Sequence, residues 1–134
     1  MRKIYISLLL SVFFFLPNYS NTSLLGYKEN NFLNMIAKEN MTKEECKDFV
    51  IYRAYGKYYS DSINPKILIG LAKVESNFNP KAIGDGGKSF GLFQIQLPTA
   101  KIYAKDITKN QLLDPEINMK IAVTHILDLK QRYK

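Results

Sequence analysis

The sequence predicts a mainly α-helical domain with a Gly-rich loop and little or no sheet. Three segments combine a capping signal with apolar residues at helical spacing, and most of the glycines lie between them. The chain has 134 residues, which suits one domain, and a chain of about this length buries roughly two thirds of its unfolded surface. Its hydrophobic content of 46% argues against global disorder.

Residues 1–23 have the order of a secretory signal peptide. Met1-Arg2-Lys3 is a short positive start, residues 4–16 are almost wholly apolar, and Pro17 opens a polar stretch. The apolar run is shorter than the roughly 20 residues that a spanning helix needs. We therefore expect an exported protein of the periplasm or cell envelope that meets the membrane only through this segment. An uncleaved N-terminal anchor is the alternative.

Residues 24–41 predict a linker with one short helix, and the domain is expected over residues 42–134. Thr42 and Glu45 fit a capping box, in which each side chain bonds the backbone of the other. Apolar residues recur at helical spacing after this box, so a helix is predicted near residues 43–59.

A second helix is predicted to start at Asn64-Pro65, a capping residue followed by a proline at the first helical position. Asn79-Pro80 should close it, because the residue before a proline disfavours helical geometry. Glu75 stands at the end of the apolar row of this helix. We expect that position to desolvate its carboxylate. The row itself comprises Ile67, Leu68, Leu71, Ala72 and Val74.

The remaining chain alternates turns and helices. Residues 84–91 predict a Gly-rich loop, residues 92–96 an extended apolar segment, and Pro98 the start of a short helix. Asp114-Pro115 caps a last amphipathic helix that continues to the C-terminal end.

The net charge of +7 comes mostly from lysine, since three of the 19 basic residues are arginine. Such a diffuse positive field favours polyanionic partners, including an acidic cell wall. A lysine-rich solvated surface explains the same composition. No basic run with interleaved aromatic residues is present, so no nucleic-acid partner is expected.

The one cysteine, Cys46, has no second cysteine with which to form an internal disulfide. It is interpreted as a buried apolar thiol on a helix face, with a free reactive thiol as the alternative. The one histidine, His125, is distant from it in sequence. We therefore predict no metal site and no cofactor.

A carboxylic acid with apolar surroundings is the group that enzymes use to protonate a departing glycosidic oxygen. Glu75 is the candidate, and an ion pair with Lys73 is the alternative reading of that residue. The possible second carboxylates show no spacing that demands a joint site, which points to chemistry with one carboxylate. They are Asp61, Asp85, Asp106 and Asp114.

Four short motifs follow one another between residues 62 and 133. They are Glu75-Ser76-x-x-Asn79-Pro80-x-Ala82, Ser89-Phe90-Gly91-Leu92-Phe93-Gln94-Ile95, Thr99-Ala100 and Asp114-Pro115-x-x-Asn118. In this order and spacing they resemble the soluble lytic transglycosylase (SLT) family, which shares a lysozyme-like fold with goose-type lysozymes. The resemblance implies a lysozyme-like helical domain that acts on the glycan strands of peptidoglycan.

By that resemblance, Glu75 matches the family's only catalytic carboxylate. The implied reaction cleaves the bond between N-acetylmuramic acid and N-acetylglucosamine and leaves 1,6-anhydromuramoyl ends. A secretion or envelope apparatus is a further implied partner. Gly91 and Asn118 are expected to support the fold. The resemblance assigns substrate binding to Ser76, Ser89, Phe93, Gln94 and Gln96.

One family feature is missing from the printed sequence. The family pattern continues with a helix that carries an Ala-Tyr-Asn-Ala-Gly type motif, whose tyrosine contacts the catalytic glutamate, and Lys134 precedes that point. A truncated product, a protein completed by a partner and a short form all fit this observation. An inactive peptidoglycan-binding or assembly protein, and a lysozyme-like hydrolase, therefore stand as alternatives to the transglycosylase.

Overall fold

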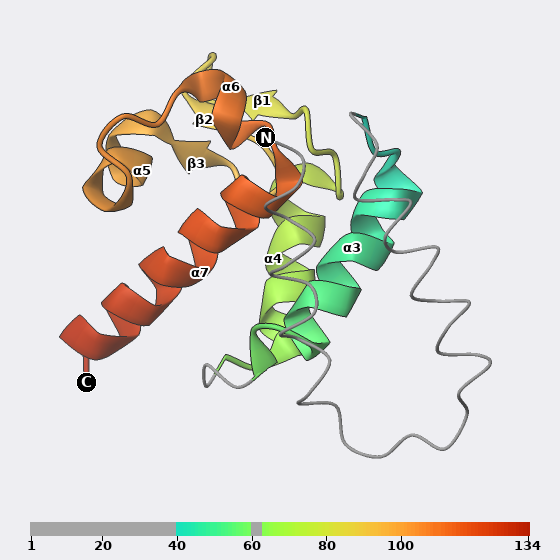
Figure 1. Cartoon of the computed structure of the whole chain (residues 1–134), viewed down its shortest axis with the longest axis horizontal. Helices are drawn as coiled ribbons and strands as arrows, with labels where there is room; N and C mark the ends of the chain where they lie inside the picture. Colours follow the sequence, from blue (N-terminus) through green and yellow to red (C-terminus); the bar gives the residue numbers. More distant parts are fainter. Residues whose placement is uncertain (1–39, 60–62) are drawn as a thin grey trace, which may run out of the picture.

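The computed structural model describes residues 40–59 and 63–134 (Figure 1). The predicted signal segment, almost all of the predicted linker and Asp61 lie outside these residues. In chain order the elements are α3 (Lys43–Tyr55), α4 (Pro65–Ser76), β1 (Ile83–Gly84), β2 (Ser89–Phe90), β3 (Ile95–Gln96), α5 (Leu97–Tyr103), α6 (Lys109–Leu112) and α7 (Pro115–Arg132). The predicted mainly α-helical class is confirmed.

The helix α3 starts where the sequence predicted and ends earlier. The Glu45 backbone N–H donates to Thr42 Oγ1 at 3.2 Å, and the Thr42 N–H donates to Glu45 Oε2 at 2.9 Å, which completes the capping box. The helix stops at Tyr55 because Gly56 follows, and glycine is a poor helix former. The prediction of a helix near residues 43–59 was therefore about one turn too long.

The helix α4 also starts as predicted, with Asn64 Oδ1 accepting from the Lys66 N–H at 3.0 Å. It ends at Ser76 because Asn77 adopts the left-handed conformation, with φ of 50°, three residues before Pro80. Leu68 and Ala72 are fully buried, whereas Val74 is 83% exposed. The buried stripe is thus narrower than the apolar row predicted.

A small antiparallel sheet follows α4, with strand order β1-β2-β3. Phe90 of β2 pairs with Ile83 on one side and with Ile95 on the other. The Gly-rich loop is therefore a hairpin, and the predicted extended segment contributes β3. Each strand has two residues, which agrees with the expectation of little or no sheet.

Two short helices precede the long C-terminal helix. The predicted short helix at Pro98 is α5, while α6 was not predicted, although Thr108 and Gln111 form a capping box there. The helix α7 begins at the predicted cap, where Asp114 Oδ1 accepts from the Ile117 N–H at 2.9 Å. None of the helices within residues 40–59 and 63–134 combines the length and the hydrophobicity of a membrane-spanning segment.

One hydrophobic core joins these elements. Figure 1 shows α3 beside α4, with α7 running away from the sheet and the short helices. The buried Arg53 of α3 donates to Glu116 Oε2 of α7 through Nε at 2.9 Å and Nη2 at 2.6 Å. The largest fully buried apolar side chains are Phe49, Leu68, Leu92, Leu112, Met119 and Val50.

Cys46 lies in this core and is 0% exposed, which confirms the interpretation of a buried apolar thiol. Burial raises the pKa of the thiol from 9.0 to about 12, with smaller contributions from the nearby Glu45 and Asp114 carboxylates. The thiolate is the reactive form of cysteine, so the folded chain holds Cys46 in an inert state.

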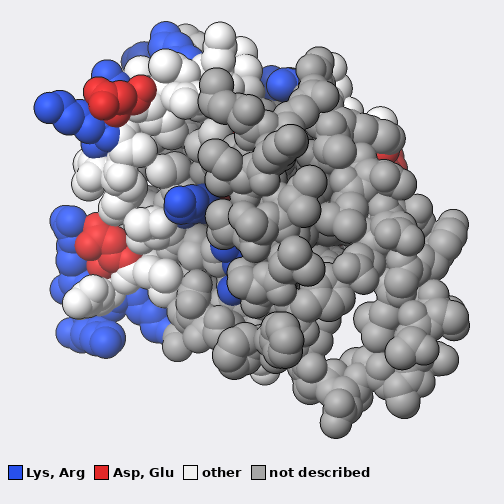
Figure 2. Space-filling view, in the orientation of Figure 1, with Lys and Arg blue, Asp and Glu red and all other residues white. Residues whose placement is uncertain are grey.

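The charged side chains are mixed on the face that can be seen in Figure 2. Lys and Arg gather there along the side formed by α5 and the end of α7, with Asp and Glu among them. Arg132 pairs with Asp128 across one helical turn, between Nη2 and Oδ2 at 2.8 Å. On the described part of this face, the positive charge is therefore interspersed with acids.

Candidate active site

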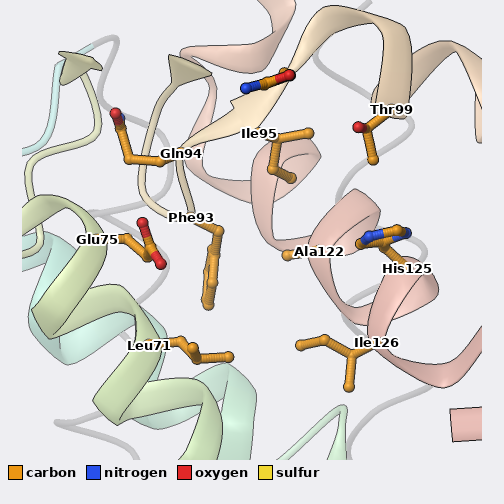
Figure 3. Close-up of a pocket in the computed structure, with 10 residues that line it drawn as sticks. Leu71, Glu75, Phe93, Gln94, Ile95, Thr99, Ala122, His125 and Ile126 are labelled. Carbon is orange, nitrogen blue, oxygen red and sulfur yellow. The ribbon is translucent and has the colours of Figure 1, made fainter. Parts of the chain in front are cut away.

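A groove of about 220 Å³ runs between α4 and α7, with the β3 region along one side (Figure 3). It contains the candidate acid and three of the five residues predicted to bind substrate. Its lining residues are Leu71, Glu75, Phe93, Gln94, Ile95, Gln96, Thr99, Ala122, His125 and Ile126.

Glu75 stands on the last turn of α4, and Figure 3 shows its carboxylate on one side of the groove beside the Phe93 ring. Its side chain is exposed, so the expectation that the apolar row desolvates it was wrong. The reason is that Glu75 lies at the open edge of the groove, one turn beyond the buried Ala72. A substrate in the groove can therefore reach the carboxylate directly.

The alternative ion pair of Glu75 with Lys73 is not formed. The Lys73 ammonium donates instead to the side-chain oxygen of Asn77, one turn further along the chain. Within residues 40–59 and 63–134, no side chain hydrogen-bonds to the Glu75 carboxylate or pairs with its charge.

Glu75 is the only carboxylate among the described residues that line this groove. Asp114 caps α7, and Asp85 accepts a hydrogen bond from the Ser89 hydroxyl in the hairpin. Asp106 is exposed and does not line the groove. The described part of the site therefore offers acid–base chemistry by one carboxyl group.

Ser76 and Ser89 do not line the groove. The Ser76 hydroxyl donates to the Leu92 carbonyl at 2.8 Å and to the Ala72 carbonyl at 3.2 Å. Ser89 is 1% exposed, and its hydroxyl donates a hydrogen bond to the Asp85 carboxylate. Ser76 thus ties the end of α4 to the loop that carries Phe93, and Ser89 fixes the hairpin.

Phe93, Gln94 and Gln96 all line the groove, but in different ways. Phe93 is 8% exposed and supplies an apolar surface next to Glu75. Gln94 has a φ of 48°, and its Nε2 donates to the carbonyls of Ala82 at 3.2 Å and Gly91 at 3.0 Å. These bonds hold a backbone conformation that residues other than glycine rarely adopt. Gln96 is exposed, and its amide makes no cap bond to α5.

Asn118 of α7 holds the loop behind the groove. Its Nδ2 donates to the carbonyls of Phe90 and Leu112, both at 2.8 Å, while its Oδ1 accepts from the Phe93 N–H at 2.9 Å. Gly91 has a φ of 77°, and a Cβ there would lie 2.3 Å from the Leu112 carbonyl oxygen. The expected supporting roles of Gly91 and Asn118 are confirmed.

The sequence did not single out a polar chain that runs from the groove into α5 and α7. Tyr103 Oη lies 2.8 Å from His125 Nδ1 and donates to Asp128 Oδ2 at 2.8 Å. The bonds from Tyr103 and Arg132 lower the pKa of Asp128, and burial with the Asp128 bond raises the pKa of Tyr103. The helical spacing of residues 125, 128 and 132 was visible in the sequence, whereas the contact with Tyr103 was not.

Comparison with known proteins gives the family of the chain. A family model described as the transglycosylase SLT domain matches residues 54–134, which include every residue that lines the groove. Neither the curated proteins nor the solved structures gave a match. The family is associated with transglycosylase-type cleavage of peptidoglycan in the cell envelope. The chain belongs to the transglycosylase SLT domain family.

Proposed function

We propose that this protein is an exported peptidoglycan lytic transglycosylase in which Glu75 is the acid and base. One observation carries the proposal. In a chain of the SLT family, Glu75 is the only carboxylate among the described residues that line the groove, and it is accessible from the groove. The reaction would serve wall turnover or open the wall for an envelope apparatus.

The reaction has two steps that use the same carboxyl group. In the first, protonated Glu75 donates its proton to the glycosidic oxygen, the bond from C1 of the muramoyl residue breaks, and the N-acetylglucosamine side leaves with a hydroxyl group. In the second, the Glu75 carboxylate takes the proton of the C6 hydroxyl as that oxygen bonds to C1. The substrate thereby supplies the nucleophile, so the scheme needs no second carboxylate.

The rest of the groove suits a sugar chain. Phe93 and Leu71 provide apolar surface beside Glu75, against which the C–H face of a pyranose ring packs. The exposed Gln96 amide offers a donor and an acceptor to hydroxyl or acetamido groups. Ser76 acts indirectly in this proposal, because its bond to the Leu92 carbonyl sets the distance between α4 and the Phe93 loop.

The test is digestion of purified peptidoglycan by the full chain, with mass spectrometry of the products. We expect 1,6-anhydromuramoyl ends and a loss of about 100-fold or more in rate for Glu75→Gln, since proton transfer by a positioned side chain contributes about that much. Glu44→Gln is the matched control, because Glu44 is exposed on α3 and lies outside the groove. Unchanged activity of Glu75→Gln would overturn the assignment.

A second candidate, glycan binding without cleavage, is favoured by the exposure of Glu75. Acids that protonate a leaving group typically sit in apolar surroundings, whereas the Glu75 carboxylate is open to water. This candidate predicts that the chain sediments with peptidoglycan and releases no product. The Glu75→Gln variant should then bind peptidoglycan as well as the unmodified chain does. Products with reducing muramic ends would indicate a hydrolase instead.

A further inference from the structure

His125 is the one ionisable side chain on the α7 side of the groove, among the described residues that line it. Figure 3 shows it across the groove from Glu75, beyond Phe93 and Ala122. Its ring meets the Tyr103 ring edge to face, with centroids 5.8 Å apart and an interplanar angle of 62°. The imidazole is therefore held in a defined orientation by a residue outside the proposed catalytic step.

The hydrogen bonds around Tyr103 determine where the imidazole proton lies. Asp128 also accepts from Arg132, with Nε to Oδ1 at 3.0 Å, so its carboxylate is ionised and has no proton to donate. A tyrosine hydroxyl has one proton, and Tyr103 donates it to Asp128 Oδ2. The 2.8 Å contact between Tyr103 Oη and His125 Nδ1 therefore requires the histidine nitrogen to be the donor.

A neutral imidazole with its proton on Nδ1 has an acceptor lone pair on Nε2. In the described part of the chain no residue bonds to Nε2, and the side chain borders the groove. A tautomer held by a second partner in this way is a common means of orienting a histidine.

We propose that His125 is a substrate-positioning residue that uses Nε2 to accept a hydrogen bond from a hydroxyl or acetamido N–H group of the glycan. This deepens the proposed function, on which it rests. The hydrogen bonds that link Arg132, Asp128 and Tyr103 select the Nδ1–H tautomer of His125 and hold the imidazole ring against rotation. An acceptor at this position favours the neutral donor groups of the sugar over the muramoyl or peptide carboxylates, which only accept.

The tautomer is directly measurable because the chain has a single histidine. In the full chain labelled with ¹⁵N-histidine, at a pH where the ring is neutral, we expect Nδ1 to show the shift of a protonated nitrogen and Nε2 that of an acceptor. Tyr103→Phe should move the signal towards the Nε2–H tautomer, whereas Tyr55→Phe, at an exposed position on α3, should not. An Nε2–H ring in the unmodified chain would overturn the proposal.

Binding is tested with a soluble tetrasaccharide of alternating N-acetylglucosamine and N-acetylmuramic acid. We expect the ¹⁵N signal of Nε2 to shift on addition, and we expect His125→Ala to weaken binding by roughly fivefold, the worth of one net hydrogen bond. His125→Gln should recover part of the loss, because its amide oxygen lies near the position of Nε2. Unchanged Kd in His125→Ala, or an Nε2 signal that does not move at saturation, would overturn the proposal.

The readout does not depend on cleavage. The tetrasaccharide titration is repeated in Glu75→Gln, so failure of the Glu75 assignment and failure of the His125 proposal give different results. If the unmodified chain cleaves peptidoglycan, His125→Ala should raise KM by a similar factor with little change in kcat. A purely structural role would instead lower Tm while KM stays constant, and that pattern would contradict the proposal.

Discussion

The Oδ1 atom of Asn118 accepts a hydrogen bond of 2.9 Å from the backbone N–H of Phe93. This bond joins α7 to the loop that carries Phe93, which lines the groove. The same carboxamide donates to the carbonyls of Phe90 and Leu112, so one fully buried side chain satisfies two backbone groups of residues 90–93 and one at the end of α6. The position of Phe93 relative to α7 thus depends on Asn118.

Replacing Asn118 with leucine should be strongly destabilising. Three buried backbone groups would lose their partner, and a buried group left without a hydrogen bond costs about 1–3 kcal/mol. We expect the free energy of unfolding to fall by about 3 kcal/mol or more in urea titrations. Asn110→Leu, at an exposed position on α6, should change it by less than about 0.5 kcal/mol. Equal effects of the two substitutions would contradict this account.

Alanine at two glycines should have opposite effects. At Gly91 a Cβ would lie 2.3 Å from the Leu112 carbonyl oxygen and 2.4 Å from Asn118 Nδ2, and φ is 77°, so Gly91→Ala should be destabilising by more than about 1 kcal/mol. At Gly70, inside α4, a Cβ meets nothing within 4 Å. Gly70→Ala should therefore be stabilising by up to about 1 kcal/mol, because alanine is the better helix former. Thermal unfolding of both variants measures the two signs.

The ion pair of Glu116 with Arg53 should stabilise the fold by more than the interaction of Glu116 with the helix dipole at the start of α7. Glu116→Gln removes the carboxylate that pairs with the buried Arg53 guanidinium, and we expect a loss of about 2 kcal/mol in the free energy of unfolding. Glu44 also lies in the first turn of a helix but forms no ion pair with another residue of the described ranges 40–59 and 63–134. Glu44→Gln should cost about 0.5 kcal/mol, the usual helix-dipole contribution. A difference near zero would show that the pair adds nothing.

Cys46 should make stability fall at high pH. Its pKa rises from 9.0 to about 12 on folding, so between these values the folded state binds more protons than the unfolded state. The stabilisation is fully present below pH 9.0 and is lost as pH rises towards about 12. From pH 9.0 to 10.5 the unmodified chain should lose about 1.6 kcal/mol more than Cys46→Ala, in paired urea titrations.

The same burial predicts slow thiol chemistry. A disulfide reagent at pH 8 should label Cys46 only as fast as the chain opens, and urea should accelerate the reaction to that of a free thiol. Rapid labelling of the folded chain, together with no pH difference from Cys46→Ala, would show that the thiol is accessible.

The starts of the principal helices could be predicted from the sequence because they rest on contacts within a few residues. Thr42 with Glu45, Asn64 with Lys66, and Asp114 with Ile117 each form such a bond. The same local signal, a capping box of Thr108 and Gln111, starts the short helix α6. The end of α4 was harder to predict, because two residues there can end a helix. Asn77, in the left-handed conformation, ends it before Pro80 is reached.

The sequence by itself determined the helical class, the burial of Cys46 and the family motifs around Glu75, because capping, periodicity and motif order are properties of nearby residues. Only the tertiary structure decided the exposure of Glu75, the burial of Ser89 and the meeting of His125 with Tyr103. These depend on which distant segments pack against each residue. Helical phase placed Glu75 on the correct face of α4, but the packing of α7 and the Phe93 loop left the end of that face open to the groove.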